Sequence, residues 1–144
     1  MVVVLGALAD DVRTTAALSG SSLVDNPDWG SGMGSSLRVG LVALRGSDAD
    51  AVVVLPVDTP GVTAEAVRRF VALGSPSVLA RATYGGSPGH PVLSGRERWH
   101  AVAELADGDA GARPYLAQQQ HDVVVVPCED VASGADVDRP EDLL

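Results

Sequence analysis

The sequence contains a single cysteine, Cys128, and no lysine. One cysteine excludes an internal disulfide framework and any metal site built from several cysteines. It also fits a reducing compartment, so we expect a cytoplasmic protein. The lack of lysine excludes a phosphate-binding P-loop, which depends on that residue.

Basic side chains are few, since 10 of them stand against 19 acidic ones, and the formal net charge is −9 at pH 7. This charge repels nucleic-acid phosphates and anionic lipids, so we expect no nucleic-acid partner and no membrane partner. A polyanionic small molecule meets the same repulsion. A phosphorylated substrate would therefore need a divalent cation or a local cationic group.

Long apolar runs are also lacking. None approaches the roughly 18 residues that cross a bilayer, and the run at 2–5 has neither a basic leader nor a small-residue cleavage site, so we expect a soluble chain without a signal peptide. The chain does have 144 residues, of which 46% are hydrophobic. That is enough for one domain with a core and too little for two, so we predict a single domain over residues 1–144.

Strand and helix patterns alternate along the chain. Unbroken β-branched runs, which are typical of strands buried on both faces, occur at residues 2–5, 51–57, 77–84 and 122–126. Helical patterns occur at residues 10–18, 35–44, 63–73, 96–105 and 110–119. In the third of these we predict Thr63 as N-cap and Gly74 as C-cap. The alternation predicts an α/β fold with a mostly parallel sheet and helices on both faces.

Two glycine clusters, at residues 30–34 and 85–89, predict loops. Phe70 and Trp99 are expected in the core because both lie within helical patterns that bury one apolar face. Neither glycine cluster marks a domain boundary.

The sharpest local motif is Leu-Pro-Val-Asp-Thr-Pro at residues 55–60, where a buried run ends in Asp58 and then Pro60. Ligands of open α/β sheets bind beyond the carboxyl ends of the strands, and a carboxylate there suits Mg²⁺ with phosphate oxygens completing the shell. Alternatively, Asp58 caps the turn into the next helix.

A second acidic group contains Asp136 and Asp138, followed by Arg-Pro-Glu-Asp-Leu at 139–143. Pro, Glu and Asp in this order are what the first turn of a helix favours, so a structural role is one interpretation. Paired with Asp58, however, these residues offer carboxylates from two separate segments, an arrangement by which an ion can bridge attacking and leaving phosphates.

Residues 26–37 form a glycine-rich loop that runs into a helix start, where free backbone N–H groups can meet an anion. The spacing of Gly30, Gly32 and Gly34 is not that of a dinucleotide-binding fingerprint. A flexible turn with Ser35 as N-cap is the alternative.

His90, between Gly89 and Pro91, could face a ligand, although no second histidine stands at metal-binding spacing. Arg113 could clamp a phosphate or pair with a surface acid.

Five blocks, taken in order, resemble the molybdenum-cofactor nucleotidyltransferases of the MobA-like superfamily, and they look more like its cytidylyltransferase branch. The blocks are N-x-x-W with G-x-G-S-S-L within 26–37, P-V-D-T-P at 56–60, G-H-P-V-L at 89–93, G-D-x-G-A-R at 108–113 and D-V-D-R-P-E-D-L at 136–143. The resemblance implies a Rossmann-like fold of the nucleotide-diphospho-sugar transferase type. It also implies transfer of CMP from CTP, or from another NTP, to the terminal phosphate of molybdopterin, with Mg²⁺ and release of pyrophosphate.

The resemblance implies site residues as well. Asp58 would be the catalytic metal ligand, and Asp136 or Asp138 the second acidic position. The residues implied near nucleotide or phosphorylated pterin are Asn26, Gly32, Ser35 and Ser36, with His90 and Arg113 on the acceptor side. Two alternatives stay open: a catalytically inactive nucleotide- or cofactor-binding module, and a related sugar-phosphate or phospholactate nucleotidyltransferase.

Members of the resembled family begin with a first strand and a glycine-rich loop of the type L-A-A-G-x-S-x-R-M-G, followed by a lysine. This sequence has neither the strand nor the loop. Because the first strand lies centrally in a Rossmann-like sheet, we expect an exposed inner edge. We also expect that the chain alone is weakly stable or associates through that edge, and that it shows no measurable nucleotidyl transfer.

Overall fold

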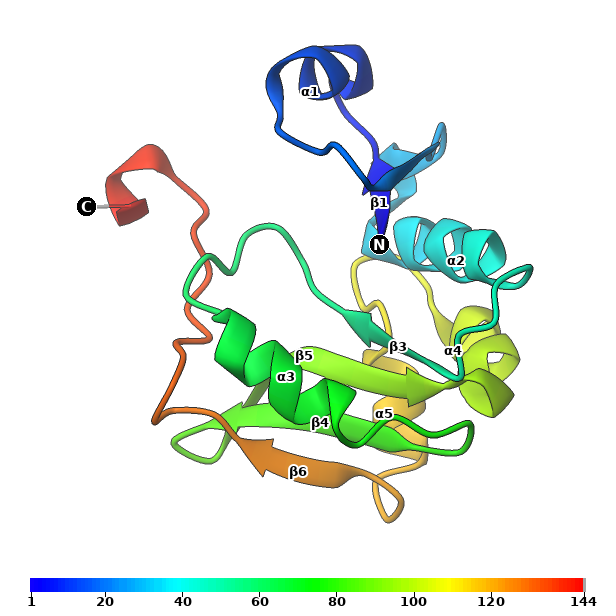
Figure 1. Cartoon of the computed structure of the whole chain (residues 1–144), viewed down its shortest axis with the longest axis vertical. Helices are drawn as coiled ribbons and strands as arrows, with labels where there is room; N and C mark the ends of the chain where they lie inside the picture. The colour runs from blue at the N-terminus through cyan, green and yellow to red at the C-terminus, as the bar shows by residue number, and fades with distance from the viewer. Residues whose placement is uncertain (144) are drawn as a thin grey trace. The chain divides into compact units, whose positions relative to one another are not determined.

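The computed structural model of the chain describes residues 1–143 and has α/β architecture (Figure 1). Its residues form two compact units, Met1–Asp48 with Trp99–Gln120, and Ala49–Arg98 with the residues from His121 onward. We call these unit 1 and unit 2 and describe each by itself. The single-domain expectation for residues 1–144 stays a prediction.

Unit 1 is built on two short parallel strands, β1 (Val2–Leu5) and β2 (Ser22–Asp25), with Val2 opposite Ser22 and Leu5 opposite Asp25. The helix α1 (Ala9–Thr15) connects them, and the turn η1 (Trp29–Ser31) and α2 (Met33–Leu44) follow. α2 packs on β1, β2 and α4 (Trp99–Leu105), and α4 packs on α5 (Arg113–Gln118). Buried apolar side chains of this unit are Leu5, Leu41, Trp99, Val102, Tyr115 and Leu116.

Unit 2 contains a four-stranded sheet in the order β3-β5-β4-β6. Its strands are β3 (Ala51–Val54), β4 (Leu79–Tyr84), β5 (Ser87–Gly95) and β6 (Val124–Pro127). β5 is antiparallel to both β3 and β4, whereas β4 and β6 are parallel. The 3-10 turns η2 (Arg96–Arg98) and η3 (Pro140–Leu143) complete the unit.

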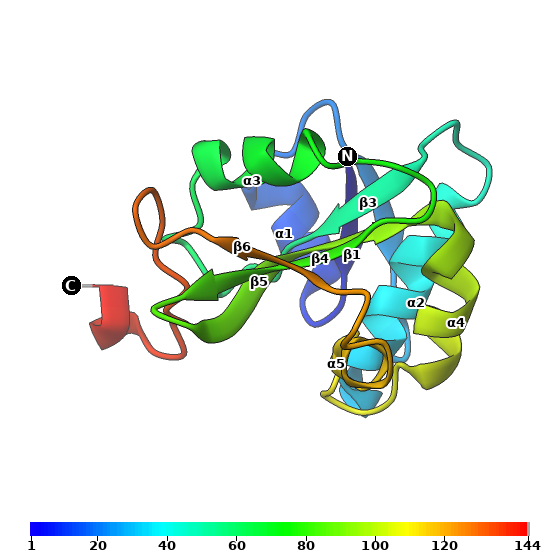
Figure 2. The same cartoon turned by 90° about the horizontal axis from the view of Figure 1, so that it is seen from below.

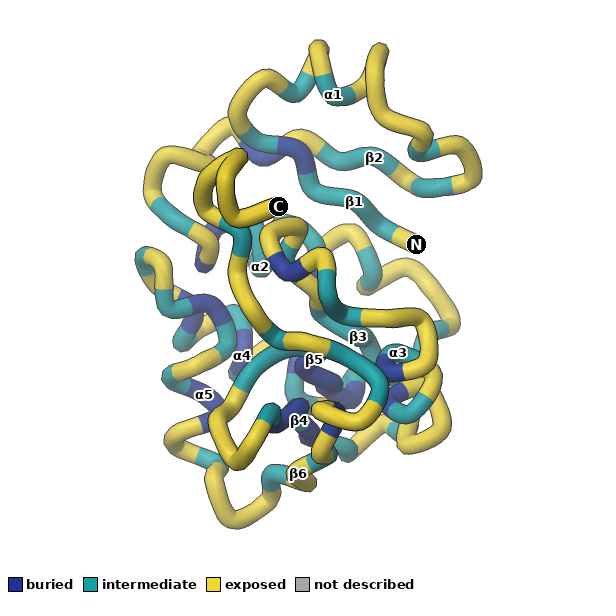
Figure 3. Tube along the Cα trace, turned by 90° about the vertical axis from the view of Figure 1, so that its left-hand side faces the viewer, coloured by how far each residue is buried: buried dark blue, intermediate teal, exposed yellow. Residues whose placement is uncertain are grey.

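The core of unit 2 lies where α3 (Ala64–Val71) covers one face of this sheet (Figure 2). Phe70 of α3 is fully buried against alanine and leucine side chains of β4 and β5 and against Cys128. In Figure 3 the two central strands β4 and β5 accordingly carry the dark blue of buried residues.

The helix predictions hold because capping and periodicity are local signals. Thr63 is the N-cap of α3 and its hydroxyl accepts a hydrogen bond from the Ala66 N–H at 3.3 Å, as predicted. Phe70 and Trp99 are core residues, also as predicted. The C-cap of α3 is Ala72 and not Gly74, so the helix ends two residues earlier than predicted.

Two strands were not predicted. β2 has the sequence Ser-Leu-Val-Asp, whose two apolar residues do not make an unbroken β-branched run. The glycine cluster at 85–89 was predicted as a loop, but it forms the tip of the β4–β5 hairpin and the start of β5. Gly85 and Gly86 make the tight turn with φ values of 57° and 85°, which favour glycine. The α/β class itself is confirmed.

Among residues 1–143, no helix has the length and apolar character needed to traverse a bilayer.

Candidate functional site

Asp58 lies beyond the carboxyl end of β3, in a segment that runs antiparallel to the chain after β6. Three hydrogen bonds join the segments: Thr63 Oγ1 donates to the Val131 carbonyl at 2.9 Å, the Ser133 N–H to the Gly61 carbonyl at 3.0 Å, and the Val137 N–H to the Asp58 carbonyl at 2.7 Å. We call residues 58–63 and 131–137 the paired segments. They bring Asp136, the neighbour of Val137, alongside Asp58.

The approach of the paired segments is close. A Cβ atom on Gly61 would lie 2.8 Å from the Ser133 carbonyl oxygen, so a larger residue would push them apart. The separation of the Asp58 and Asp136 backbones is therefore set by main-chain contacts, and their carboxylates remain exposed.

His90, on β5, lies within electrostatic range of both carboxylates. Burial lowers the pKa of His90, and the positive charge of Arg81 lowers it further, while Asp58 and Asp136 act in the opposite direction. The net effect is a lowered pKa, which favours the neutral imidazole. Unit 2 thus gathers three of the predicted site residues, Asp58, Asp136 and His90.

Asp138 is placed differently from Asp136. Its backbone N–H and that of Arg139 both donate to Asp142 Oδ2, at 3.2 Å and 3.0 Å. The Asp142 carboxylate therefore accepts hydrogen bonds from the backbone N–H groups at the start of η3. This is the structural role that the Pro-Glu-Asp sequence favours at the first turn of a helix. Asp136 is the member of this acidic group that the paired segments bring alongside Asp58.

The donor set fits a magnesium ion that keeps other ligands. Residues 1–143 contain no group of three or more His, Cys, Asp or Glu side chains arranged to hold a metal. What unit 2 offers is a pair of exposed carboxylates, Asp58 and Asp136, and Mg²⁺ is commonly held by one or two carboxylates together with waters and substrate phosphates.

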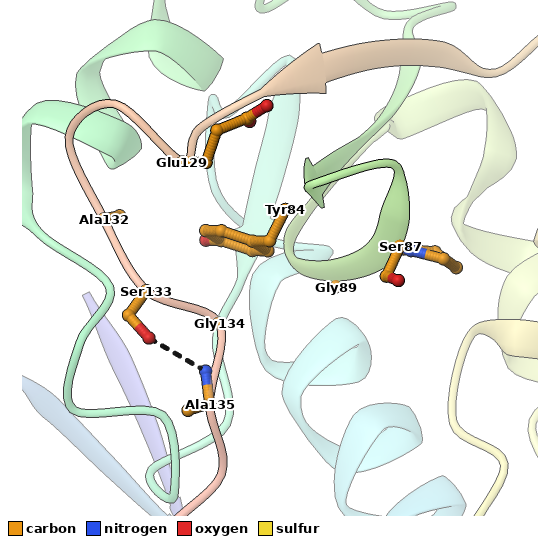
Figure 4. Close-up of a pocket in the computed structure, with 9 residues that line it drawn as sticks. Tyr84, Ser87, Gly89, Glu129, Ala132, Ser133, Gly134 and Ala135 are labelled. Carbon is orange, nitrogen blue, oxygen red and sulfur yellow. Dashed lines mark hydrogen bonds between the residues drawn. The ribbon is translucent and has the colours of Figure 1, made fainter.

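A pocket of about 350 Å³ adjoins this cluster in sequence (Figure 4). It is lined by Tyr84, Ser87, Pro88, Gly89, Glu129, Ala132, Ser133, Gly134 and Ala135. Two of its lining residues, Gly89 and Ala135, directly precede His90 and Asp136 in the sequence. The volume falls in the range of small-molecule sites.

Tyr84 is a pocket residue that the sequence analysis missed. Its hydroxyl donates to the His90 carbonyl at 2.7 Å, and its ring lies between the hairpin and the loop after β6 (Figure 4). A Cβ atom on Gly134 would lie only 2.5 Å from the ring. The Tyr-Gly-Gly sequence at 84–86 was a hairpin signal that could have pointed to it.

In unit 1, Asn26 is 2% exposed and holds the loop 26–36 from within. Its Nδ2 donates to the Ser35 and Ser36 hydroxyls at 2.8 Å and 2.9 Å, and its Oδ1 accepts from the Asp28 N–H at 3.0 Å. Three of the predicted residues are therefore together, but their hydrogen bonds to one another fix the loop. The N-cap of α2 is Gly32, so Ser35 is not the N-cap that we considered.

Two glycines of the same loop, Gly32 and Gly34, are required for packing. Gly32 has a φ of 116°, and a Cβ atom there would lie 2.5 Å from Gly108 backbone atoms. The Gly34 N–H donates to the Gly108 carbonyl at 2.8 Å. Arg113 begins α5, where its side chain is exposed.

The comparisons with known proteins agree with this architecture. A family model described as the MobA-like NTP transferase domain matches residues 1–124. Nicotine blue oxidoreductase of Paenarthrobacter nicotinovorans is 37% identical over 150 residues, which cover 99% of this chain and 72% of that protein.

Two solved structures are similar to this one. The Rv0371c protein of Mycobacterium tuberculosis H37Rv, in complex with manganese, has a TM-score of 0.78 and 28% identity, covering 99% of this chain and 73% of that chain. A nucleotidyl transferase from Methanothermobacter thermautotroptrophicus has a TM-score of 0.79 and 18% identity, covering 99% and 68%. At that identity the second likeness shows the fold, which is the Rossmann-like fold of nucleotidyl transferases.

Proposed function

This chain belongs to the MobA-like NTP transferase family, a family of nucleotidyltransferases, and from that premise we propose that its site serves the transfer of CMP from CTP to the terminal phosphate of molybdopterin. An acceptor phosphate oxygen forms a bond to the α-phosphorus of CTP. The bond from that phosphorus to the β-phosphate oxygen breaks, and pyrophosphate leaves with the electron pair.

The observation that supports the proposal best is the hydrogen bond from the Val137 N–H to the Asp58 carbonyl at 2.7 Å, which brings Asp136 alongside Asp58. We assign these two carboxylates to a divalent cation, Mg²⁺ or Mn²⁺. When bound, the cation supplies neutralisation of phosphate charge. The manganese in the Rv0371c relative is in keeping with such an ion.

In this proposal His90 lies beside the acceptor substrate, molybdopterin. With its pKa lowered by burial, the imidazole is neutral at pH 7 and does not add charge beside a phosphate. We assign Arg113, an exposed guanidinium, to a phosphate of either substrate because its planar donors match phosphate geometry.

Asn26, Ser35 and Ser36 act in this proposal by orienting the loop 26–36, because their side chains already bond to one another. Gly32 lets that loop approach the 108–109 turn. These residues are therefore positioning residues for the nucleotide or pterin. A cytoplasmic location is part of the proposal and rests on the buried free thiol of Cys128.

A second candidate function is favoured by the 37% identity to nicotine blue oxidoreductase across 99% of the chain. In that case the chain catalyses an oxidation or reduction of nicotine blue or a related compound. The carboxylate pair has no evident role in such a reaction, which is why we place nucleotidyl transfer first.

The deciding experiment uses the purified chain preceded by a first strand and a glycine-rich loop of the family type, with the chain alone in parallel. Each protein is incubated with molybdopterin and CTP or GTP, in Mg²⁺ and in Mn²⁺, and pyrophosphate release is measured. A parallel reaction contains nicotine blue and a two-electron donor, and its absorbance is followed. CTP-dependent pyrophosphate release that disappears in Asp58→Asn and persists in Glu65→Gln supports the proposal. Dye reduction without pyrophosphate release supports the oxidoreductase. CTP binding with neither reaction identifies an inactive binding module.

A further inference from the structure

Trp29 stands apart from the other aromatic side chains of this protein, of which there are five, all within residues 1–143. Phe70, Trp99 and Tyr115 are buried, and the Tyr84 hydroxyl is bonded to the His90 carbonyl. Trp29 is 51% exposed. Among the aromatic residues of 1–143, Trp29 is therefore the only exposed one, and its side chain is the one most open to a ligand from solvent.

The position of Trp29 is that of a ligand-binding residue. It follows the carboxyl end of β2, and its side chain lies against Gly6, which follows the carboxyl end of the parallel neighbour β1. A Cβ atom on Gly6 would lie 2.8 Å from Trp29 Cβ and 3.1 Å from Cγ. Ligands of open α/β sheets bind at this end of the strands.

The backbone on both sides of Trp29 is fixed before any ligand arrives. Ahead of it, the Asp28 N–H donates to Asn26 Oδ1 at 3.0 Å, and the Asp28 carbonyl accepts from the Ser35 hydroxyl at 3.0 Å. Behind it, the Gly32 N–H donates to the Trp29 carbonyl at 3.2 Å. An exposed ring on an immobile backbone loses little conformational entropy on binding.

The charge around Trp29 selects against phosphate as its direct partner. Asp25, the last residue of β2, and Asp28 are both exposed and precede Trp29 in the sequence. Within residues 1–143 the partner found for the Asp25 carboxylate is Arg13, at 2.6 Å. A neutral planar ring is not repelled by these acids. It also offers a π face that an indole can stack on.

We propose that Trp29 is a stacking platform for a planar heteroaromatic ring, either the pyrimidine base of the nucleotide or the pterin ring of the acceptor. This inference rests on the proposed function for the choice between those two rings. It assigns the loop 26–36 the task of holding Trp29 at the end of the strands, and it makes Trp29 a determinant of affinity for the ring and not for the phosphates.

The test uses the full chain and three probes in Mg²⁺ buffer: CTP, inorganic tripolyphosphate, which lacks a base, and unphosphorylated pterin. Affinities are measured by calorimetry, and indole emission is followed in the same titrations. Stacking on Trp29 should quench the emission with CTP or with pterin, and tripolyphosphate should leave it unchanged. In Trp29→Phe the quenching should disappear, while the buried Trp99 still emits.

The matched variants separate a ring contact from a structural role. Trp29→Leu keeps apolar bulk but no π face, and it should weaken the binding of the ring-bearing probe about 5- to 100-fold, the range for loss of one base–aromatic stack. Tripolyphosphate affinity should not change. Trp29→Phe should retain most of the affinity, and Val42→Ala, at an exposed position of α2, should behave as the parent.

Several outcomes would overturn the inference: equal affinity of the parent and Trp29→Leu for both ring-bearing probes, absence of quenching by either ring, or a parallel loss of tripolyphosphate binding. So would a Trp29→Leu variant altered only in its association with another protein. If CTP quenches the emission but no pyrophosphate is released, the inference stands and the proposed transfer fails. If pyrophosphate is released and the KM values for CTP and pterin are unchanged in Trp29→Leu, the transfer stands and the inference fails.

Discussion

Asp58 is held in position by a main-chain hydrogen bond, and its side chain is exposed to solvent. Its carbonyl accepts from the Val137 N–H, whereas its carboxylate is exposed beyond the end of β3. A residue of this kind can lose its charge without loss of the structure around it.

We therefore expect Asp58→Asn to weaken Mn²⁺ binding at least about tenfold, since the substitution removes one of the two carboxylates that we assign to the cation. The melting temperature should stay within about 2 °C, as surface substitutions rarely exceed 0.5 kcal/mol. Manganese titration followed by electron paramagnetic resonance gives the affinity. Asp138→Asn is the matched control and should bind as the parent does; parent-like binding by Asp58→Asn would make Asp58 an ordinary turn residue.

Cys128 gives a pH dependence with a definite sign. Burial raises the pKa of its thiol above the ordinary value of 9.0; the charge of Arg69 opposes this, and Asp130 and Glu129 add to it. Because the raised pKa belongs to the folded state, the folded chain binds more protons than the unfolded chain above pH 9, and the free energy of unfolding falls as pH rises. The thiol makes its full contribution to the free energy of unfolding below pH 9.

Urea unfolding at pH 7.5, 9 and 10 should show a loss of stability that is smaller in Cys128→Ala. The comparison of slopes matters here, since the substitution also shortens a buried side chain and lowers stability at every pH. Tyr84, whose pKa is also raised by burial, contributes in both proteins at the upper end of the range. Identical slopes in the two proteins would show that the thiol does not titrate differently on unfolding.

At the scale of elements, the loop 26–36 depends on one buried amide. Asn26→Ala removes three hydrogen bonds, to Ser35, Ser36 and the Asp28 N–H, and should cost about 3 kcal/mol at about 1 kcal/mol each. Ser36→Ala removes one of them and should cost about 1 kcal/mol. Chemical denaturation measures both. Equal losses would mean that the loop does not act through Asn26.

The hairpin β4–β5 is joined to the chain after β6 by the Tyr84 ring. Gly134→Ala would place a Cβ atom 2.5 Å from that ring. The ring must move, so we expect a loss of about 1–3 kcal/mol from overpacking and weakening of the bond to the His90 carbonyl. Gly46→Ala, at a position with open space around it, is the control. Stability of Gly134→Ala equal to that control in urea would show that the ring has room.

Local signals account for what could be predicted of these elements. The helices were found because capping residues such as Thr63 and a 3.6-residue period act within a few residues. β5 was missed because its first half, Ser-Pro-Gly-His-Pro, consists of turn residues, and only its pairing with β3 and β4 makes it a strand. The carboxylates at 58 and 136 could be paired by motif, but the main-chain contact between their segments could not be read from either sequence.

At the scale of the whole molecule, sheet edges set the solution behaviour. β6 is an edge of the unit 2 sheet, with Val124 and Val125 48% and 55% exposed. Such an edge favours pairing with another copy. The net charge of −9 opposes contact between copies, and salt screens it. We expect association that grows with protein concentration and with salt.

Sedimentation at several concentrations in 0.05 M and 0.5 M NaCl measures this association. Val125→Lys should reduce it, because a charge on an edge strand disfavours edge pairing. Val42→Lys puts the same charge on an exposed site of α2 and should have a smaller effect. A chain that stays monomeric under all conditions would remove self-association from this account.

The antiparallel course of residues 58–63 and 131–137 has a consequence for variation in this protein. The partners along it are Thr63 with Val131, Gly61 with Ser133 and Asp58 with Val137. Each contact therefore depends on the count of residues from it to the next, which is three on one segment and four on the other between the last two contacts. Exchange of an exposed side chain leaves that count intact. A deletion of one residue would shift every later position by about 3.3 Å and carry Asp136 past its partner. Exposed positions outside the carboxylate pair can therefore vary in residue type, whereas a larger residue at Gly61 or a change in the length of either segment would move Asp136 relative to Asp58.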